Sequence, residues 1–251
     1  MLTLRMVSPM LALAAATACG GSTPASPAAP AGKASDPATV STIAVTVTFD
    51  GEAPKPEMMR LDGDPKCVSE NGASERPSED IILGDGKSLQ NVFVYVKSGL
   101  GDYAFPMPKE PVVLDQLKCR YTPRVLGIRA GQPLAIRNSD PLLHNVRADG
   151  TINQPFNMGH PIQGTTFNRT FATGEVMVPF RCDVHNWMRA WVGVLDHPFY
   201  GVTGPTGRVA LAGLPPGTYT IEAWHEKLGA NTEQITVAAK DAKDVAFTFT
   251  R

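Results

Sequence analysis

The chain has 251 residues, of which 43% are hydrophobic and 7% aromatic. That length suits one large or two small cores, since domains typically hold ~100–150 residues. Its 23 Lys and Arg nearly balance its 24 Asp and Glu, for a formal charge of -1. Such a balance leaves no large basic face and argues against a nucleic-acid partner. The 22 Pro and 23 Gly punctuate short apolar runs, which favours strands and turns over long helices.

The first residues are typical of a secretory signal peptide, 1–18. Arg5 precedes a short apolar run, and small residues then lead to Cys19 and Gly20. No run reaches the ~18 apolar residues of a membrane span. The segment resembles a bacterial lipoprotein signal. That resemblance implies a lipid on Cys19 and an exported, periplasmic or cell-envelope protein that touches a membrane only through this anchor, with Gly20 favouring the outer membrane. The alternative is an ordinary secreted protein with an unpaired cysteine.

Residues 20–39 consist of Gly, Ser, Thr, Pro and Ala, apart from Lys33 and Asp36. Such a composition has almost nothing to bury. It predicts a disordered linker that, together with Cys19, covers residues 19–39.

The body then begins with strands. Residues 42–49 alternate apolar and polar side chains, the pattern of a half-buried strand, and residues 91–97 repeat it with three valines on one face. Between them, residues 50–80 have no period and many Pro, Gly and acidic residues, so we expect a long loop there. These features define an N-terminal β region over 40–110.

The four cysteines are Cys19, Cys67, Cys119 and Cys182. In an oxidising compartment, cysteines usually form disulfides unless they have another role. Cys19 is accounted for by the lipid, and Cys182 lies in the motif described next. The remaining pair, Cys67 and Cys119, is predicted to form a disulfide that ties the long loop to the strand that follows. The alternative is two unrelated buried thiols.

A cluster of chemically soft side chains lies further along the chain. Residues 176–182 alternate, with Val176, two further apolar residues and Cys182 on one face. A tight turn holding His185 follows, and Met188 opens another alternating strand. We therefore expect Cys182, His185 and Met188 to converge at one end of two neighbouring strands.

A fourth group comes from upstream, where His144 follows the turn at 138–141. Two imidazoles, a thiolate and a weak thioether ligand are the type 1 copper set. Zinc usually takes four strong ligands, and the thioether of Met188 is a weak one. A Cys182 nucleophile with a His185 base is possible but leaves Met188 unexplained. A degenerate site that folds without metal is the remaining alternative.

His144-Asn145-Val146 followed by Cys182-x-x-His185-x-x-Met188 resembles the cupredoxin family of plastocyanins and amicyanins. The resemblance covers about residues 111–196 and implies a Greek-key β-sandwich. It implies one mononuclear copper held by these two histidines, the cysteine and the methionine, with Asn145 bracing the cysteine loop. Asn186 departs from the family, since amicyanin-like loops have Pro there.

The C-terminal region, 197–251, carries Leu-Pro-Pro-Gly-Thr-Tyr at 214–219 after a Gly-rich hairpin. This resembles the non-catalytic carboxypeptidase-regulatory-like module, a smaller prealbumin-like β-sandwich. Because 55 residues are few for a full sandwich, residues 40–100 and 198–251 are expected to share one, with the copper module inserted. The alternative is a simple series of domains.

The sequence therefore predicts an all-β, exported type 1 copper protein that carries one electron at a time. It is not expected to be an enzyme, because four protein ligands leave no open position for substrate. Its expected partner is a redox protein such as a cytochrome or copper oxidase, docking on an apolar patch that includes Trp187 beside His185. The alternatives are a periplasmic copper storage or delivery protein, and a non-redox interaction module with a vestigial site.

Overall fold

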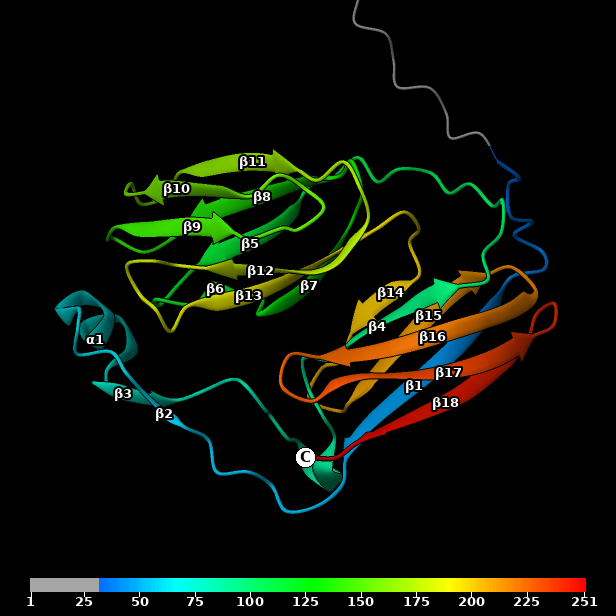
Figure 1. The fold of residues 1–251 in the computed structure, drawn as a ribbon, viewed down its shortest axis with the longest axis horizontal. Coiled ribbons are helices and arrows are strands. Elements are labelled where there is room, and N and C mark those ends of the chain that lie inside the picture. Colours follow the sequence, from blue (N-terminus) through cyan, green and yellow to red (C-terminus); the bar gives the residue numbers. More distant parts are fainter. Residues whose placement is uncertain (1–31) are drawn as a thin grey trace, which may run out of the picture.

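The computed structural model describes residues 32–251, and its fold is all-β as predicted, with one short α-helix in that part of the chain. Four large sheets form two β-sandwiches that lie side by side (Figure 1). The expected signal peptide 1–18 and the lipid-bearing Cys19 lie outside the described residues. Within residues 32–251, no helix has both the length and the apolar character to cross a membrane.

The larger sandwich packs a five-stranded sheet, of order β10-β9-β12-β13-β7, against a four-stranded sheet, of order β11-β8-β5-β6. Alternating apolar side chains such as Ile136, Val146 and Phe180 fill the space between the two sheets. The strand bounds are β5 (Val112–Gln116), β6 (Tyr121–Thr122), β7 (Val125–Arg129), β8 (Pro133–Asn138), β9 (His144–Ala148), β10 (Phe156–His160), β11 (Thr166–Thr170), β12 (Glu175–Arg181) and β13 (Arg189–Leu195).

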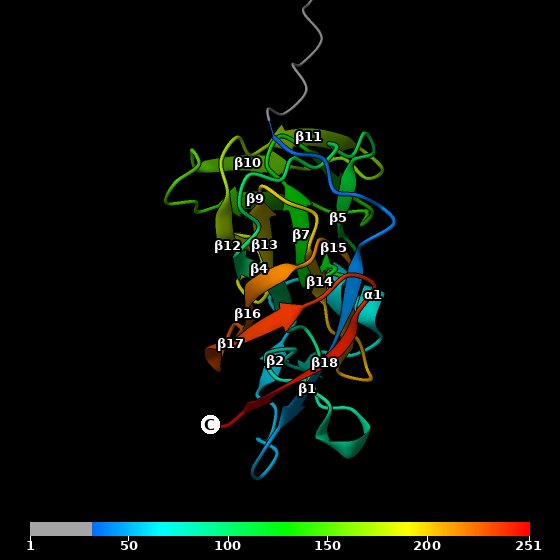
Figure 2. The ribbon, with the colours of Figure 1, turned by 90° about the vertical axis from the view of Figure 1, so that its right-hand side faces the viewer.

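The smaller sandwich is built from both ends of the described chain. Its sheets have the orders β15-β1-β18 and β14-β4-β16-β17, and β1 runs parallel to β18 beside it (Figure 2). Strands that precede residue 100 thus pair with strands that follow residue 198, and the larger sandwich is inserted between them. The bounds are β1 (Ser41–Phe49), β4 (Phe93–Ser98), β14 (Tyr200–Val202), β15 (Arg208–Leu214), β16 (Gly217–His225), β17 (Gly229–Val237) and β18 (Ala242–Phe249).

The two sandwiches meet through a third apolar cluster. Phe93 and Tyr95 of β4 face the larger sandwich, whereas the valines that alternate with them face the core of the smaller one. Both faces of β4 are therefore buried, so its alternation of side chains separates two cores rather than a core and solvent.

Residues 50–80 are not the plain loop that the sequence suggested. β2 (Met58–Arg60) pairs with β3 (Glu75–Pro77), and α1 (Pro65–Asn71) lies between them. The Asp64 side chain caps α1 by accepting the N–H of Lys66, Pro65 fills the first helical turn, and Gly72 ends the helix at φ 66°. We call residues 58–77 the cap segment, because it covers the end of the larger sandwich where β12 joins β13 (Figure 1).

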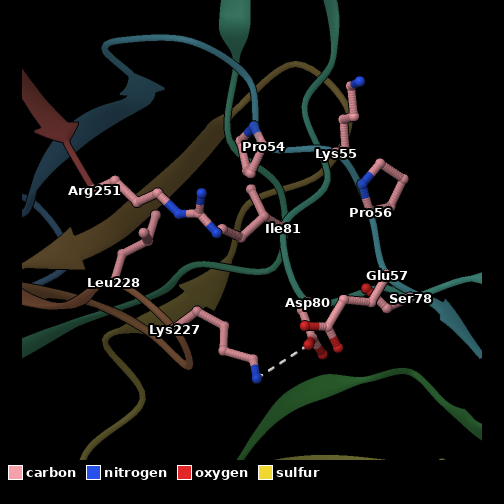
Figure 3. Close-up of a pocket in the computed structure, with 10 residues that line it drawn as sticks. All are labelled: Pro54, Lys55, Pro56, Glu57, Ser78, Asp80, Ile81, Lys227, Leu228 and Arg251. Carbon is pink, nitrogen blue, oxygen red and sulfur yellow. Dashed lines mark ion pairs between the residues drawn. The ribbon is translucent and has the colours of Figure 1, made fainter.

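The predicted disulfide between Cys67 of α1 and Cys119 is confirmed, with the two Cα atoms 5.7 Å apart. The fully buried Leu61 and Cys67 place the cap segment in the same apolar core as the larger sandwich. Just beyond the cap segment, Asp80 pairs with Lys227 at 3.1 Å in the groove of Figure 3, which tethers the chain to the loop between β16 and β17. A short 3-10 turn, η1 (Asp85–Lys87), then leads towards β4.

Two further expectations need correction. The expected linker overlaps the described residues at 32–39, and there Lys33 forms a β-bridge with Tyr103. Ordered contacts thus begin before residue 40, because the backbone of Lys33 hydrogen-bonds to Asp102 and Ala104.

The expected face of Val176 in β12 is the second correction. Val176 does not share the buried face of Cys182, because it is 38% exposed. A register shift at Met177, whose φ is 63°, turns Val176 outward.

Candidate metal centre

The four expected ligands lie at one end of the larger sandwich. His144 opens β9, and Cys182 follows the last residue of β12. A turn then carries His185 and returns to Met188, which precedes β13; the N–H of Met188 donates to the carbonyl of His185 at 2.9 Å. All four residues are at most 2% exposed, so the site is enclosed by the protein.

Three donor atoms converge there. The Nδ1 atoms of His144 and His185 are 3.0 Å apart, and Cys182 Sγ is 3.8 Å from His185 Nδ1. Ligand atoms of all three residues lie within 4.8 Å of one another. Two imidazole nitrogens and one thiolate therefore face a common centre, and the buried Met188 belongs to the same apolar cluster as Cys182.

A carboxylate holds the far side of each imidazole. Asp140 Oδ2 lies 2.8 Å from His144 Nε2, and Asp64 Oδ2 lies 3.1 Å from His185 Nε2. Asp140 also accepts the backbone N–H groups of Lys118 and Cys119, at 2.6 and 2.7 Å. The two carboxylates favour a proton on each Nε2, the tautomer in which each Nδ1 lone pair is free to bind a metal ion.

This donor set fits a metal ion. Two Nδ1 lone pairs that face each other at 3.0 Å repel one another unless a cation or a proton lies between them. Carboxylate–imidazole pairs of this kind fix the tautomer and orientation of metal-binding histidines. With a thiolate as the third donor and a thioether nearby, the arrangement suits a soft or borderline transition metal.

The sulfur of Cys182 is prepared as a thiolate. Burial by itself raises the pKa of this thiol, but contacts with the imidazoles of His144 and His185 and hydrogen bonds from two backbone N–H groups outweigh burial and lower the pKa to about 6. The two backbone donors are those of Asn145 and His185, each 3.4 Å from Sγ. The same contacts act on His144, where burial lowers the pKa but Asp140 and Cys182 raise it overall.

Asn145 lies where the family resemblance places it, beside the cysteine loop. Its side-chain oxygen accepts the N–H of Asp183, the residue after Cys182, and its amide nitrogen donates to Asn157. These contacts join β9 to the ligand turn and hold the backbone next to Cys182.

His185 and Trp187 are less exposed in the structure than the expected docking patch requires. His185 is 1% exposed, and its outer nitrogen faces Asp64 of the cap segment rather than solvent. Trp187 is partly buried against the core, and its indole N–H donates to the carbonyl of Cys119 at 3.1 Å. The cap segment thus covers the edge of His185 through which a partner was expected to meet the metal.

Sequence reasoning did not single out Asp64 or Asp140. The sequence shows Asp140 only as part of the turn at 138–141, although it stands four residues before His144. The sequence does contain a signal at Asp64, since Asp before Pro marks the start of a helix, and Asp64-Pro65 stands just before Cys67. Nothing in the sequence links that helix to His185, which is 121 residues away.

No protein-family model matches the sequence, and no curated protein matches it. Among solved structures, a copper-containing nitrite reductase from Thermus scotoductus SA-01 is similar at 21% identity over 38% of this chain and 24% of that one, with a TM-score of 0.33. The Cu(I) form of an amicyanin mutant is similar at 20% identity over 35% of this chain and 85% of that one, with a TM-score of 0.31. A purple cupredoxin from Nitrosopumilus maritimus is similar at 24% identity over 30% of this chain and 81% of that one, with a TM-score of 0.27.

Proposed function

We propose that this protein is an exported type 1 copper protein that carries one electron at a time. The observation that supports it is the donor set: two histidine Nδ1 atoms 3.0 Å apart, each imidazole backed by a carboxylate, with Cys182 Sγ beside them. His144, Cys182 and His185 would hold the ion, and Met188 would be the weak fourth ligand. Copper bound there would supply a one-electron couple.

The surrounding residues favour a carrier over an enzyme. The ligands are buried and come from β-strand ends and a tight hydrogen-bonded turn, so little rearrangement is expected when one electron arrives or leaves. Four protein ligands would leave no open position for substrate. We therefore propose a redox protein partner and no catalytic reaction, with a lipid on Cys19 holding the protein at a membrane.

Titration of the chain from Gly20 to Arg251 with Cu(II), followed by optical and EPR spectroscopy, tests the proposal. We expect an intense visible thiolate-to-copper band that is lost in Cys182→Ser, because the serine oxygen cannot supply the soft donor. Met188→Leu is the matched control: it keeps the volume and the three strong donors, so the band should persist with altered parameters. Binding without this band would instead indicate copper storage or delivery, and no binding would contradict a metal role.

A second measurement separates a carrier from a storage protein. A carrier should cycle repeatedly between its two oxidation states and retain its copper in the presence of a Cu(I) chelator, because its ligands are enclosed. Ready loss of Cu(I) to the chelator, without redox cycling, would contradict the carrier role.

A further inference from the structure

We propose that Asp64, presented by the cap segment, is a positioning residue that sets the orientation and tautomer of His185 and tunes the metal centre. The inference rests on the proposed function for its effect on copper, but the contact between Asp64 and His185 stands on the geometry alone. The Asp64 carboxylate reaches His185 from 121 residues away in sequence, with Oδ2 3.1 Å from Nε2.

The two oxygens of Asp64 have separate tasks. Oδ1 accepts the N–H of Lys66 at 2.9 Å and so caps α1, whereas Oδ2 faces His185. The cap fixes the rotation of the carboxylate, because an N-cap side chain must point back at the first helical turn. The orientation of His185 is thereby coupled to the position of α1.

The position of α1 is in turn fixed by contacts that do not involve His185. The disulfide joins Cys67 to Cys119, the Lys66 ammonium donates to the carbonyl of Pro141 at 3.1 Å, and the Asn71 amide donates to the carbonyl of Lys118 at 3.1 Å. These partners flank Asp140, which supports the other imidazole. The disulfide therefore ties together the two regions that hold the two carboxylates.

This arrangement has an electrostatic consequence for a bound ion. The Asp64 side chain is 27% exposed, so solvent screens its charge in part, but the imidazole that lies between this charge and the ion is buried, at 1% exposed. A negative charge there favours Cu(II) over Cu(I). Supporting groups of this kind typically change metal affinity about 10- to 100-fold when they are mutated.

Asp64→Asn is the decisive variant, with Asp62→Asn as its matched control. Asn is also a good N-cap residue, so α1 should persist, but the amide lacks the charge and accepts a weaker hydrogen bond. Asp62 lies two residues away in the same segment and pairs with the exposed Arg60 instead of a histidine. Circular dichroism and thermal unfolding check that both variants fold.

The first readout needs no copper. Nitrogen-15 NMR of the metal-free protein should find the His185 ring protonated at Nε2 in the wild type and in Asp62→Asn, and as a tautomer mixture in Asp64→Asn. The second readout is the reduction potential of the copper form. In Asp64→Asn we expect Cu(II) binding to weaken about tenfold relative to Cu(I), which raises a one-electron potential by about 59 mV.

The two readouts separate the possible failures. If Asp64→Asn matches the wild type in both the tautomer and the potential, Asp64 is only a helix cap and the inference is wrong. If the tautomer shifts but even the wild-type chain binds no Cu(II), the positioning role stands and the proposed copper function is wrong.

Discussion

Single buried residues in this protein have pKa values that a few neighbours and burial shift far from the ordinary ones. Burial opposes ionisation of Glu175, but its carboxylate accepts the N–H groups of Thr151, Ile152 and Asn153, and the pKa falls to about 2. His225, at 1% exposed, shows the reverse case. Burial, assisted by the positive charge of Arg124 and opposed by Asp80, lowers its pKa to about 4. This histidine is neutral in the folded protein near pH 7.

His225 should therefore make stability fall with acidification. The unfolded chain takes up a proton near pH 6.5, whereas the folded chain resists it down to about pH 4. The contribution is complete above pH 6.5, declines as the pH falls, and levels off below pH 4. Between pH 7.5 and 5 it amounts to about 2 kcal/mol. Urea unfolding of metal-free His225→Leu should show a pH dependence reduced by that amount, and an unchanged slope relative to the wild type would contradict the assignment.

At the scale of elements, the cap segment is the feature that encloses the candidate metal centre, because Asp64 lies against the outer nitrogen of His185. The segment reaches the core through Leu61, which follows β2, and through Cys67 of α1, both fully buried, and the N-cap residue of α1 reaches His185. A short helix of this length would not persist alone in water. The disulfide, which closes a loop across 52 positions of sequence, therefore supports both the helix and the contact with His185.

Replacing both Cys67 and Cys119 by Ser should destabilise the protein by about 4 kcal/mol, the chain-entropy value for a loop of this size. Urea unfolding of metal-free protein measures the loss, and the wild type under reductant is the control, since it removes the same bond without changing the side chains. The cap segment should also become more sensitive to protease. A change below about 1 kcal/mol would mean that packing of Leu61 and its neighbours is enough to hold the cap segment.

The sequence predicts contacts between residues that are close along the chain, and it misses contacts that only the fold creates. Cys182, His185 and Met188 lie in one turn, so their spacing alone indicates a site. The two remaining cysteines, in a chain that the sequence predicts to be exported, indicate the disulfide. Asp64 and Asp140 act across the fold, and no local pattern connects them to the histidines. The prediction that Val176 is buried is wrong for a different reason. The positive φ of Met177 breaks the two-residue period of the strand, so Val176 turns outward.

For the whole molecule, the telling feature is how closely the two sandwiches approach. Gly127 of β7 and Gly193 of β13 are neighbours in parallel register on the face that meets the smaller sandwich. A Cβ on Gly193 would lie 2.4 Å from the Phe93 ring, and one on Gly127 would lie 2.4 Å from the Tyr200 ring. Both rings come from the smaller sandwich. The missing side chains thus make room for the stacked Phe93 and Tyr200 rings, whose centroids are 5.8 Å apart.

Gly193→Ala should push these rings out of place and lower the stability of the whole chain by about 1–3 kcal/mol, the usual effect of overpacking. Gly159→Ala on β10 is the control, because its Cβ would meet nothing within 4 Å.

Unfolding followed by tryptophan fluorescence measures the effect, since Trp191 and Trp224 pack together across the same interface, with their ring centroids 5.2 Å apart. Phe93→Leu should recover part of the loss when combined with Gly193→Ala, because the shorter side chain relieves the clash. Equal stability of Gly193→Ala and Gly159→Ala would mean that the sandwiches can separate at no cost, and that the candidate metal centre and the smaller sandwich are mechanically independent.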